Sequence, residues 1–296
     1  MIEVKNLTQI YKSGKGVFDL NFTIKEGEVF GYIGPNGAGK TTTIRNLLGF
    51  ANPTKGSAVI NGINCRKEAA KLQNTIGYLP GEITFFENMK GMEFLRFMCE
   101  MRHTKDLSRR DELIELFELD TKGKIKKMSK GMKQKLGIVT AFMHDPSIYI
   151  LDEPTSGLDP LMQNLFMNLL DREKERGKTI MMSSHIFEEV QRVCDRAGII
   201  KDGRIVAVED VQSLNAMKQE TFIIRLSNKN DVSKLMNNKL DVKKITDKKV
   251  KITVNNNYKE FFKILSDCSV IGLEAEQQSL ENVFMKYYGK DGVTHE

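Results

Sequence analysis

Short apolar runs separated by turn residues occupy the first third of the chain. Residues 4–11 and 17–24 predict strands, and the continuous apolar run at 29–33 predicts a buried strand. Asn61-Gly62 lies between the apolar runs at 58–60 and Ile63, which predicts a hairpin with a two-residue turn. These elements indicate a β-rich beginning.

The spacing becomes helical from residue 91 to about residue 119, where apolar residues recur every three to four positions. Apolar runs return at 148–151 and 179–182, separated by an amphipathic segment at 161–176. This alternation of strand, helix and strand predicts a parallel sheet. A last hairpin is expected around Asp202-Gly203.

The pattern changes again after about residue 215. It predicts, in order, a strand, a helix, two strands, a helix, a strand and a final helix at 222–226, 232–236, 242–245, 250–254, 258–265, 270–275 and 280–288. The order β-α-β-β-α-β is that of a ferredoxin-like α+β domain. We therefore expect a first domain at 1–215 and an accessory domain at 216–296.

Composition supports two folded domains and limits the function classes. The chain has 296 residues, of which 40% are hydrophobic and 28% charged, and its net charge is +6. This charge is weaker than that of a dedicated nucleic-acid binder; it suits phosphates or anionic lipids, and simple solubility explains it equally well. The four cysteines form no CxxC pair, which argues against a zinc site or a disulfide framework.

The sequence also bears on membranes. It holds no apolar run approaching the ~20 residues that span a bilayer. The first five residues are charged and strand-like, so we expect no signal peptide.

One segment has the pattern GxxxxGK[ST]: it runs from Gly34 to Thr41, directly after the predicted buried strand and before a predicted helix. Its glycines allow backbone N–H groups to face a phosphate. Lys40 would bring a positive charge to the β- and γ-phosphates, and the Thr41 hydroxyl would bind Mg²⁺. The segment predicts a nucleotide-binding phosphate loop.

Two carboxylates, Asp152 and Glu153, follow the apolar run at 148–151. Parallel α/β sheets bind ligands at the carboxyl ends of their strands, so these acids are expected beside the phosphates. Asp152 suits a Mg²⁺ ligand, and Glu153 suits a base that polarises the attacking water.

With these motifs the chain resembles the ABC ATPase family from about residue 1 to residue 210. Residues 128–134, Met-Ser-Lys-Gly-Met-Lys-Gln, stand where the family has its LSGGQ signature, and residues 156–159 resemble its D-loop. His185 resembles the switch histidine and Tyr11 the aromatic residue that stacks on adenine. Two departures matter. Lys130 and Met132 replace a glycine and the glutamine of the signature. Gly81 replaces the expected Q-loop glutamine, so Glu82 is either a candidate Mg²⁺ ligand or an ordinary exposed loop carboxylate.

The resemblance implies a P-loop NTPase core with an antiparallel β subdomain and a helical subdomain at about 85–140. It implies ATP and Mg²⁺ as cofactors and catalysis by Glu153, His185 and Lys40. Metal binding is expected at Thr41, Asp152 and Glu82. The nucleotide is expected to contact Tyr11, Gly34, Asn36, Gly37, Ala38, Gly39, Lys40, Thr41, Thr42, Ser129, Gly131 and Asp159.

Partners also follow from the resemblance. The signature is a helix N-terminus that, in the family, meets ATP bound by another subunit, so we expect a second ATP-binding subunit, either a copy of this chain or a close paralogue. The pattern is similar to the ATPase subunits of bacterial drug, antibiotic or peptide exporters. It implies a separate polytopic permease and a peripheral location on the cytoplasmic face of the membrane.

Two other function classes fit the sequence less well. A soluble ABC ATPase acting on ribosomes or DNA would have two cassettes or a long insert between Thr41 and Asp152, and the sequence has neither. A small-molecule kinase with a phosphate loop would not explain the signature or His185. The lysines at 124–135 could form a nucleic-acid patch, but we interpret them as a solvated face and expect no nucleic-acid partner.

Overall fold

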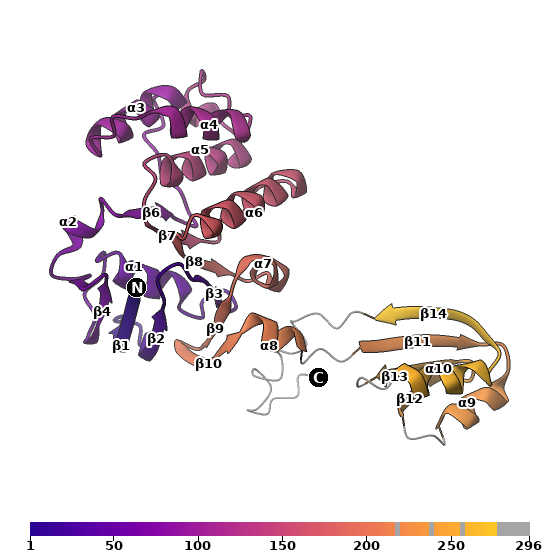
Figure 1. Cartoon of the computed structure of the whole chain (residues 1–296). Coiled ribbons are helices and arrows are strands. Elements are labelled where there is room, and N and C mark those ends of the chain that lie inside the picture. The colour runs from indigo at the N-terminus through magenta and orange to yellow at the C-terminus, as the bar shows by residue number, and fades with distance from the viewer. Residues whose placement is uncertain (217–219, 237–239, 255–257, 277–296) are drawn as a thin grey trace. The chain divides into compact units, whose positions relative to one another are not determined.

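The computed structural model describes residues 1–216, 220–236, 240–254 and 258–276. The chain divides into two compact units, one spanning Met1–Gln212 and the other beginning at Ser213. Both units are drawn in Figure 1. Within the described residues, the helices are all too short or too polar to cross a membrane.

A six-stranded sheet forms the centre of the first unit, in the order β10-β9-β3-β8-β7-β6. Its first five strands along the chain pair in parallel, and only the last runs antiparallel to its neighbour. The prediction of a parallel sheet is thus confirmed. The strands are β3 Val29–Ile33, β6 Ile76–Leu79, β7 Ile148–Asp152, β8 Thr179–Ser184, β9 Arg196–Lys201 and β10 Arg204–Asp210.

A second, antiparallel sheet has the order β2-β1-β4-β5. Asn61 and Gly62 both have positive φ angles, 48° and 79°, as the predicted two-residue hairpin requires. The inner face of this sheet shares one hydrophobic core with helix α1 (Lys40–Leu47) and with β3 and β7. Its strands are β1 Ile2–Ile10, β2 Gly16–Ile24, β4 Lys55–Ile60 and β5 Ile63–Asn64.

Three helices stack together beyond the β6 and β7 edge of the large sheet (Figure 1). They are α3 Gly91–Met101, α4 Ser108–Leu116 and α5 Lys130–Phe142. The predicted helical spacing at 91–119 corresponds to α3 and α4, whose apolar residues Phe94, Leu95 and Leu113 are buried. The first unit also contains α2 Ala69–Leu72, the 3-10 turn Ile125–Lys127, α6 Pro160–Glu175 and α7 Phe187–Val193. Helix α8, Val211–Ala216, begins in the first unit and ends in the second.

The second unit has the element order β-α-β-β-α-β and one antiparallel sheet in the order β12-β13-β11-β14. Its own hydrophobic core includes Ile224, Val250, Ile252 and Phe261. The expected helix at 280–288 lies outside the described residues. The elements are β11 Glu220–Leu226, α9 Lys229–Met236, β12 Asp241–Thr246, β13 Lys249–Val254, α10 Tyr258–Ser266 and β14 Val270–Glu276.

Candidate functional site

The segment between β3 and α1 is shaped by its glycines. Gly37 and Gly39 have φ angles of 82° and 114°, a region that side chains disfavour. A Cβ at Gly34 would lie 2.4 Å from the Ile200 carbonyl oxygen, whereas a Cβ at Gly37 would meet nothing within 4 Å. The loop is therefore closely packed underneath and open at Gly37, as a backbone cradle for phosphate requires.

Lys40 begins α1, and its side chain is 5% exposed. Its Nζ donates hydrogen bonds to the carbonyl oxygens of Gly34 (2.7 Å) and Pro35 (3.2 Å) and lies 3.2 Å from Glu153 Oε1. The ammonium group is thus fixed inside the loop, where it can neutralise an anion. Asn36 is exposed at the loop, Thr42 is partly exposed in the first turn of α1, and the carbonyl oxygen of buried Ala38 accepts a hydrogen bond from Gly203 N.

Asp152 ends β7, and its carboxylate is buried. Oδ2 accepts a hydrogen bond from Thr41 Oγ1 at 2.8 Å, and Oδ1 accepts one from Ser183 Oγ at 2.5 Å. Among the described residues, no group of three or more His, Cys, Asp and Glu side chains could hold a metal. Mg²⁺ bound to a nucleotide commonly uses only one or two carboxylates, with the remaining ligands from phosphates and water, so Thr41 and Asp152 fit this ion.

Glu153 follows in a strained conformation, with a φ angle of 47°. Its backbone N–H donates to both the carbonyl oxygen and Oγ of Ser183, at 3.2 and 3.1 Å. Its carboxylate lies between Lys40 and His185, whose Nδ1 is 3.4 Å from Glu153 Oε2. The structure therefore brings the three predicted catalytic residues together, with Lys40 at the start of α1 and Glu153 and His185 directly after β7 and β8.

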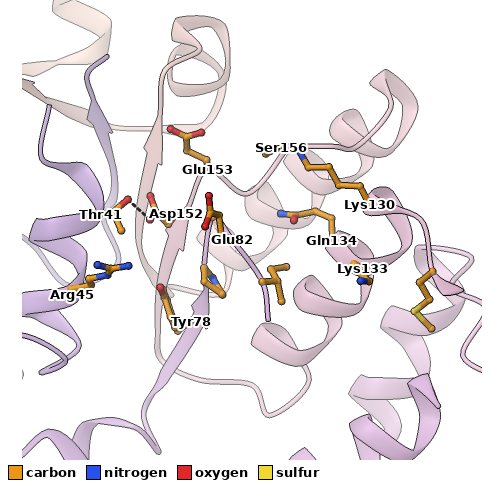
Figure 2. A pocket seen from close by; sticks show the side chains of 14 residues that line it. Thr41, Arg45, Tyr78, Glu82, Lys130, Lys133, Gln134, Asp152, Glu153 and Ser156 are labelled. Atoms are coloured by element: carbon orange, nitrogen blue, oxygen red, sulfur yellow. Dashed lines mark hydrogen bonds between the residues drawn. The ribbon is translucent and has the colours of Figure 1, made fainter. Parts of the chain in front are cut away.

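A cleft of about 880 Å³ opens beside these residues. Thr41, Asp152 and Glu153 line one side, and Lys130 and Lys133 of α5 line the other (Figure 2). Glu82, on the segment after β6, points into the same space.

Sequence reasoning did not identify Arg45 or Tyr78, which also line the cleft. Arg45 stands one helical turn after Thr41, a spacing that could have indicated it. Burial raises the pKa of the Tyr78 hydroxyl to about 12, and the charge of Asp152 contributes. Tyr78 is therefore neutral at physiological pH.

The signature residues contact the turn that follows Glu153. Ser129 caps α5 by accepting a hydrogen bond from Met132 N at 3.2 Å. Lys130 lies across Gly157, with its Nζ 3.4 Å from Ser156 Oγ, and a Cβ at Gly131 would lie 3.1 Å from the Gly157 carbonyl oxygen. The helix end that begins with Ser129 is thereby fixed beside this turn.

Two further hydrogen bonds stabilise the site. Gln134 Nε2 donates to the Pro154 carbonyl oxygen at 2.6 Å, which ties α5 to the turn; sequence reasoning did not identify this contact. Asp159 caps α6 through a 3.0 Å hydrogen bond from Met162 N. Tyr11 follows β1, with its side chain 40% exposed.

Comparisons with known proteins find relatives over most of this chain. A family model described as ABC transporter matches residues 17–156. The chain is 37% identical over 248 residues to the bacitracin transport ATP-binding protein BcrA of Bacillus licheniformis, covering 82% of this chain and 80% of that protein. It is 29% identical over 313 residues to the linearmycin resistance ATP-binding protein LnrL of Bacillus subtilis, covering 98% and 99%. The dimeric ATP-binding cassette MJ0796, solved in a post-hydrolysis state with ADP and Pi, matches with a TM-score of 0.66 at 26% identity, covering 71% of this chain and 99% of that one.

Proposed function

The chain belongs to the ABC transporter ATP-binding proteins, and from this premise we propose that it powers export through a separate membrane permease. It binds and hydrolyses ATP, as the cassettes of this family do.

The observation that carries the mechanism is the position of Glu153 between Lys40 and His185. Glu153 accepts a proton from the water that attacks the γ-phosphate, and His185 orients this carboxylate. Lys40 neutralises phosphate charge, held by the carbonyl oxygens of Gly34 and Pro35. We propose that the nucleotide contacts the residues predicted for it from the sequence, with Tyr11 stacking on the base.

Magnesium would be held by Thr41 and Asp152, whose oxygens already meet at 2.8 Å, with Glu82 facing the same cleft. When bound, the ion would neutralise charge on the phosphate oxygens. Ser183 holds Asp152 in place through its 2.5 Å hydrogen bond, so the carboxylate is oriented by the protein itself.

Two cassettes would close on each other during each cycle. The capped N-terminus of α5, with Ser129 and Gly131, offers backbone N–H groups suited to an anion, and in our proposal it meets ATP bound by a second subunit. Asp159, at the start of α6, would join this interface. The partner is a second copy or a close paralogue.

Export and location are proposed from the relatives. BcrA and LnrL are named for bacitracin transport and linearmycin resistance, and we extend this class of cargo to our chain. A polytopic permease would place it on the cytoplasmic face of the membrane. We interpret the second unit, with its β-α-β-β-α-β order and four-stranded antiparallel sheet, as a ferredoxin-like accessory domain starting near residue 216.

Drug resistance tests the proposal. The chain is expressed with its candidate permease in sensitive bacteria, with the Glu153→Gln chain as the matched control. We expect the inhibitory concentration of bacitracin or linearmycin to rise only with the wild-type chain. Equal sensitivity with both chains would contradict export of these compounds, while co-purification of the chain with the permease would test the partnership separately.

A further inference from the structure

A buried carboxylate outside the predicted site connects the two loops that carry Glu153 and His185. Glu189 belongs to α7, whose residues follow His185, and it is 9% exposed. Its Oε1 accepts a hydrogen bond from Thr155 Oγ1 at 2.5 Å, and its Oε2 accepts one from Ser184 Oγ at 2.6 Å. Both hydroxyl groups are also buried, so each bond is sheltered from water.

The positions of the two donors matter. Thr155 follows Glu153 by two residues, and Ser184 immediately precedes His185. Ser184 Oγ also accepts a hydrogen bond from Ile186 N at 2.9 Å, so His185 is flanked by fixed residues on both sides. One carboxylate therefore holds the loop of the proposed base and the loop of its histidine partner at a fixed separation.

Glu153 needs such support because of its backbone. A non-glycine residue with a φ angle of 47° keeps this conformation only where surrounding contacts over-determine it. Ser183 accepts a hydrogen bond from the Glu153 N–H, and Gln134 donates one to the Pro154 carbonyl oxygen. The next residue, Thr155, is held by its hydrogen bond to Glu189. Removal of the Glu189 bonds would release the turn on the side facing His185.

We propose that Glu189 is a positioning residue for hydrolysis: it fixes Glu153 and His185 relative to each other without touching the nucleotide. The proposal rests on the proposed role of Glu153 as the base. Small displacements of a catalytic group can cost about 100-fold in rate, while groups that bind the ground state stay in place. Loss of Glu189 should therefore lower kcat and leave nucleotide affinity almost unchanged.

The test compares Glu189→Gln with Glu188→Gln in the full chain. Glu188 is the exposed neighbour on the same helix, so both variants lose one negative charge from α7. We expect Glu189→Gln to lower kcat roughly 10- to 100-fold with KM and ATP affinity within about 3-fold, and Glu188→Gln to behave as wild type. A Glu189→Gln kcat within about 3-fold of wild type would overturn the proposal.

A second pair keeps the proposal testable if Glu189→Gln does not fold. Thr155→Val removes the hydroxyl group with little change of shape, whereas Thr155→Ser restores it. We expect the valine variant to lose kcat and the serine variant to recover most of it. Equal kcat in the two variants would contradict the proposed role of this hydrogen bond.

Coupling to Glu153 separates this inference from the mechanism on which it rests. If Glu189 acts through Glu153, Glu189→Gln should cost almost nothing further in a Glu153→Gln background under single-turnover conditions. An equal additional loss there would show independent action and overturn the proposal. Normal hydrolysis by Glu153→Gln alone would instead remove Glu153 from its role as the base.

Discussion

The Nζ atom of Lys40 lies 3.2 Å from Oε1 of Glu153, although the phosphate loop and the carboxyl end of β7 are far apart in sequence. Lys40 also donates to two carbonyl oxygens of its own loop. Glu153 in turn lies 3.4 Å from His185 Nδ1 through its other oxygen. The lysine, the glutamate and the histidine thus form one row of charged and polar groups, and each can be tested separately.

Glu153→Gln should retain ATP binding and lose most of its hydrolysis. Glutamine preserves the shape of the side chain but cannot accept the proton from water, and loss of a general base typically costs about 10²–10⁴-fold in rate. Phosphate release measures the turnover and isothermal titration the binding. Turnover within a few-fold of wild type would exclude this role.

Lys40→Ala should weaken ATP binding itself, because the buried ammonium group meets the phosphates in the ground state. Loss of a hydrogen bond to a charged group costs about 1.5–3 kcal/mol, which corresponds to roughly a 10- to 100-fold rise in Kd. Lys71→Ala is a suitable control, since that side chain is 70% exposed. Unchanged ATP affinity in Lys40→Ala would mean that the phosphate loop does not bind as proposed.

The sequence predicted the parts of the site that consist of contiguous motifs. A GxxxxGK[ST] segment and an apolar run ending in Asp152-Glu153 each define their own strand end, and parallel pairing brings these ends to one edge of the sheet. Likewise, the pattern at 250–254 predicted β13, in which Val250, Ile252 and Val254 are buried.

The remaining contacts depend on tertiary packing. The hydrogen bonds from Gln134 to Pro154 and from Thr155 to Glu189 join separate elements, and no periodicity in the sequence indicates such pairs. Short elements such as α7, with seven residues, and β6, with four, gave too little pattern to predict. The packing of Lys130 on Gly157 requires the relative position of α5 and the turn.

Ser129 should act on the site of another subunit. One variant, Ser129→Arg, disrupts the capped end of α5. The other, Lys40→Ala, disrupts the phosphate loop of the subunit that carries it. In mixed dimers of the two variants, at most one of the two sites is intact, so partial ATPase activity should reappear upon mixing. Normal hydrolysis by each variant alone, with monomers in the presence of ATP, would contradict the two-subunit site.

His144 should make the folded state sensitive to mild acid. Burial and the neighbouring Arg102, whose Nη1 lies 2.8 Å from His144 Nε2, lower the pKa of this histidine from 6.5 to about 4. As the pH falls, His144 takes up a proton in the unfolded chain before it does so in the folded chain. The contribution of neutral His144 to the stability of the folded state is therefore complete above pH 6.5 and is lost as the pH falls toward 4. Between pH 7.5 and pH 5 the free energy of unfolding should fall by about 2 kcal/mol from this group.

Urea unfolding at the two pH values measures this loss, with His144→Gln as the control. Glutamine has no titration in this range and can still accept a hydrogen bond from Arg102. Between pH 7.5 and pH 5, the free energy of unfolding of the His144→Gln variant should therefore fall by about 2 kcal/mol less than that of the wild-type chain. An identical pH dependence in both chains would exclude His144 as its source.

The second unit should contribute to contacts between subunits rather than to catalysis. Strand register places Lys251 of β13 on the same sheet face as Lys243 of β12, Ile223 of β11 and Glu274 of β14. On this face Arg225 forms an ion pair with Glu274 at 2.9 Å and Lys251 forms one with Glu276, so the face carries both charges in pairs. A face that carries both charges can form such pairs with a second copy of itself about a two-fold axis.

Truncation after Ala216 tests this role. The cut keeps α8, which begins with the buried Val211. The Val211 N–H donates a hydrogen bond to the Asp195 carbonyl oxygen. The nucleotide-binding unit should therefore stay folded and bind ATP. Light scattering in the Glu153→Gln background should show weaker ATP-dependent dimerisation than in the full-length Glu153→Gln chain. Because the face carries opposite charges, added salt should also weaken the full-length dimer more than the truncated one. Equal dimerisation and equal turnover with and without the second unit would mean that the second unit is not coupled to the ATPase. Unfolding of the truncated chain would instead mean that the domain boundary lies elsewhere.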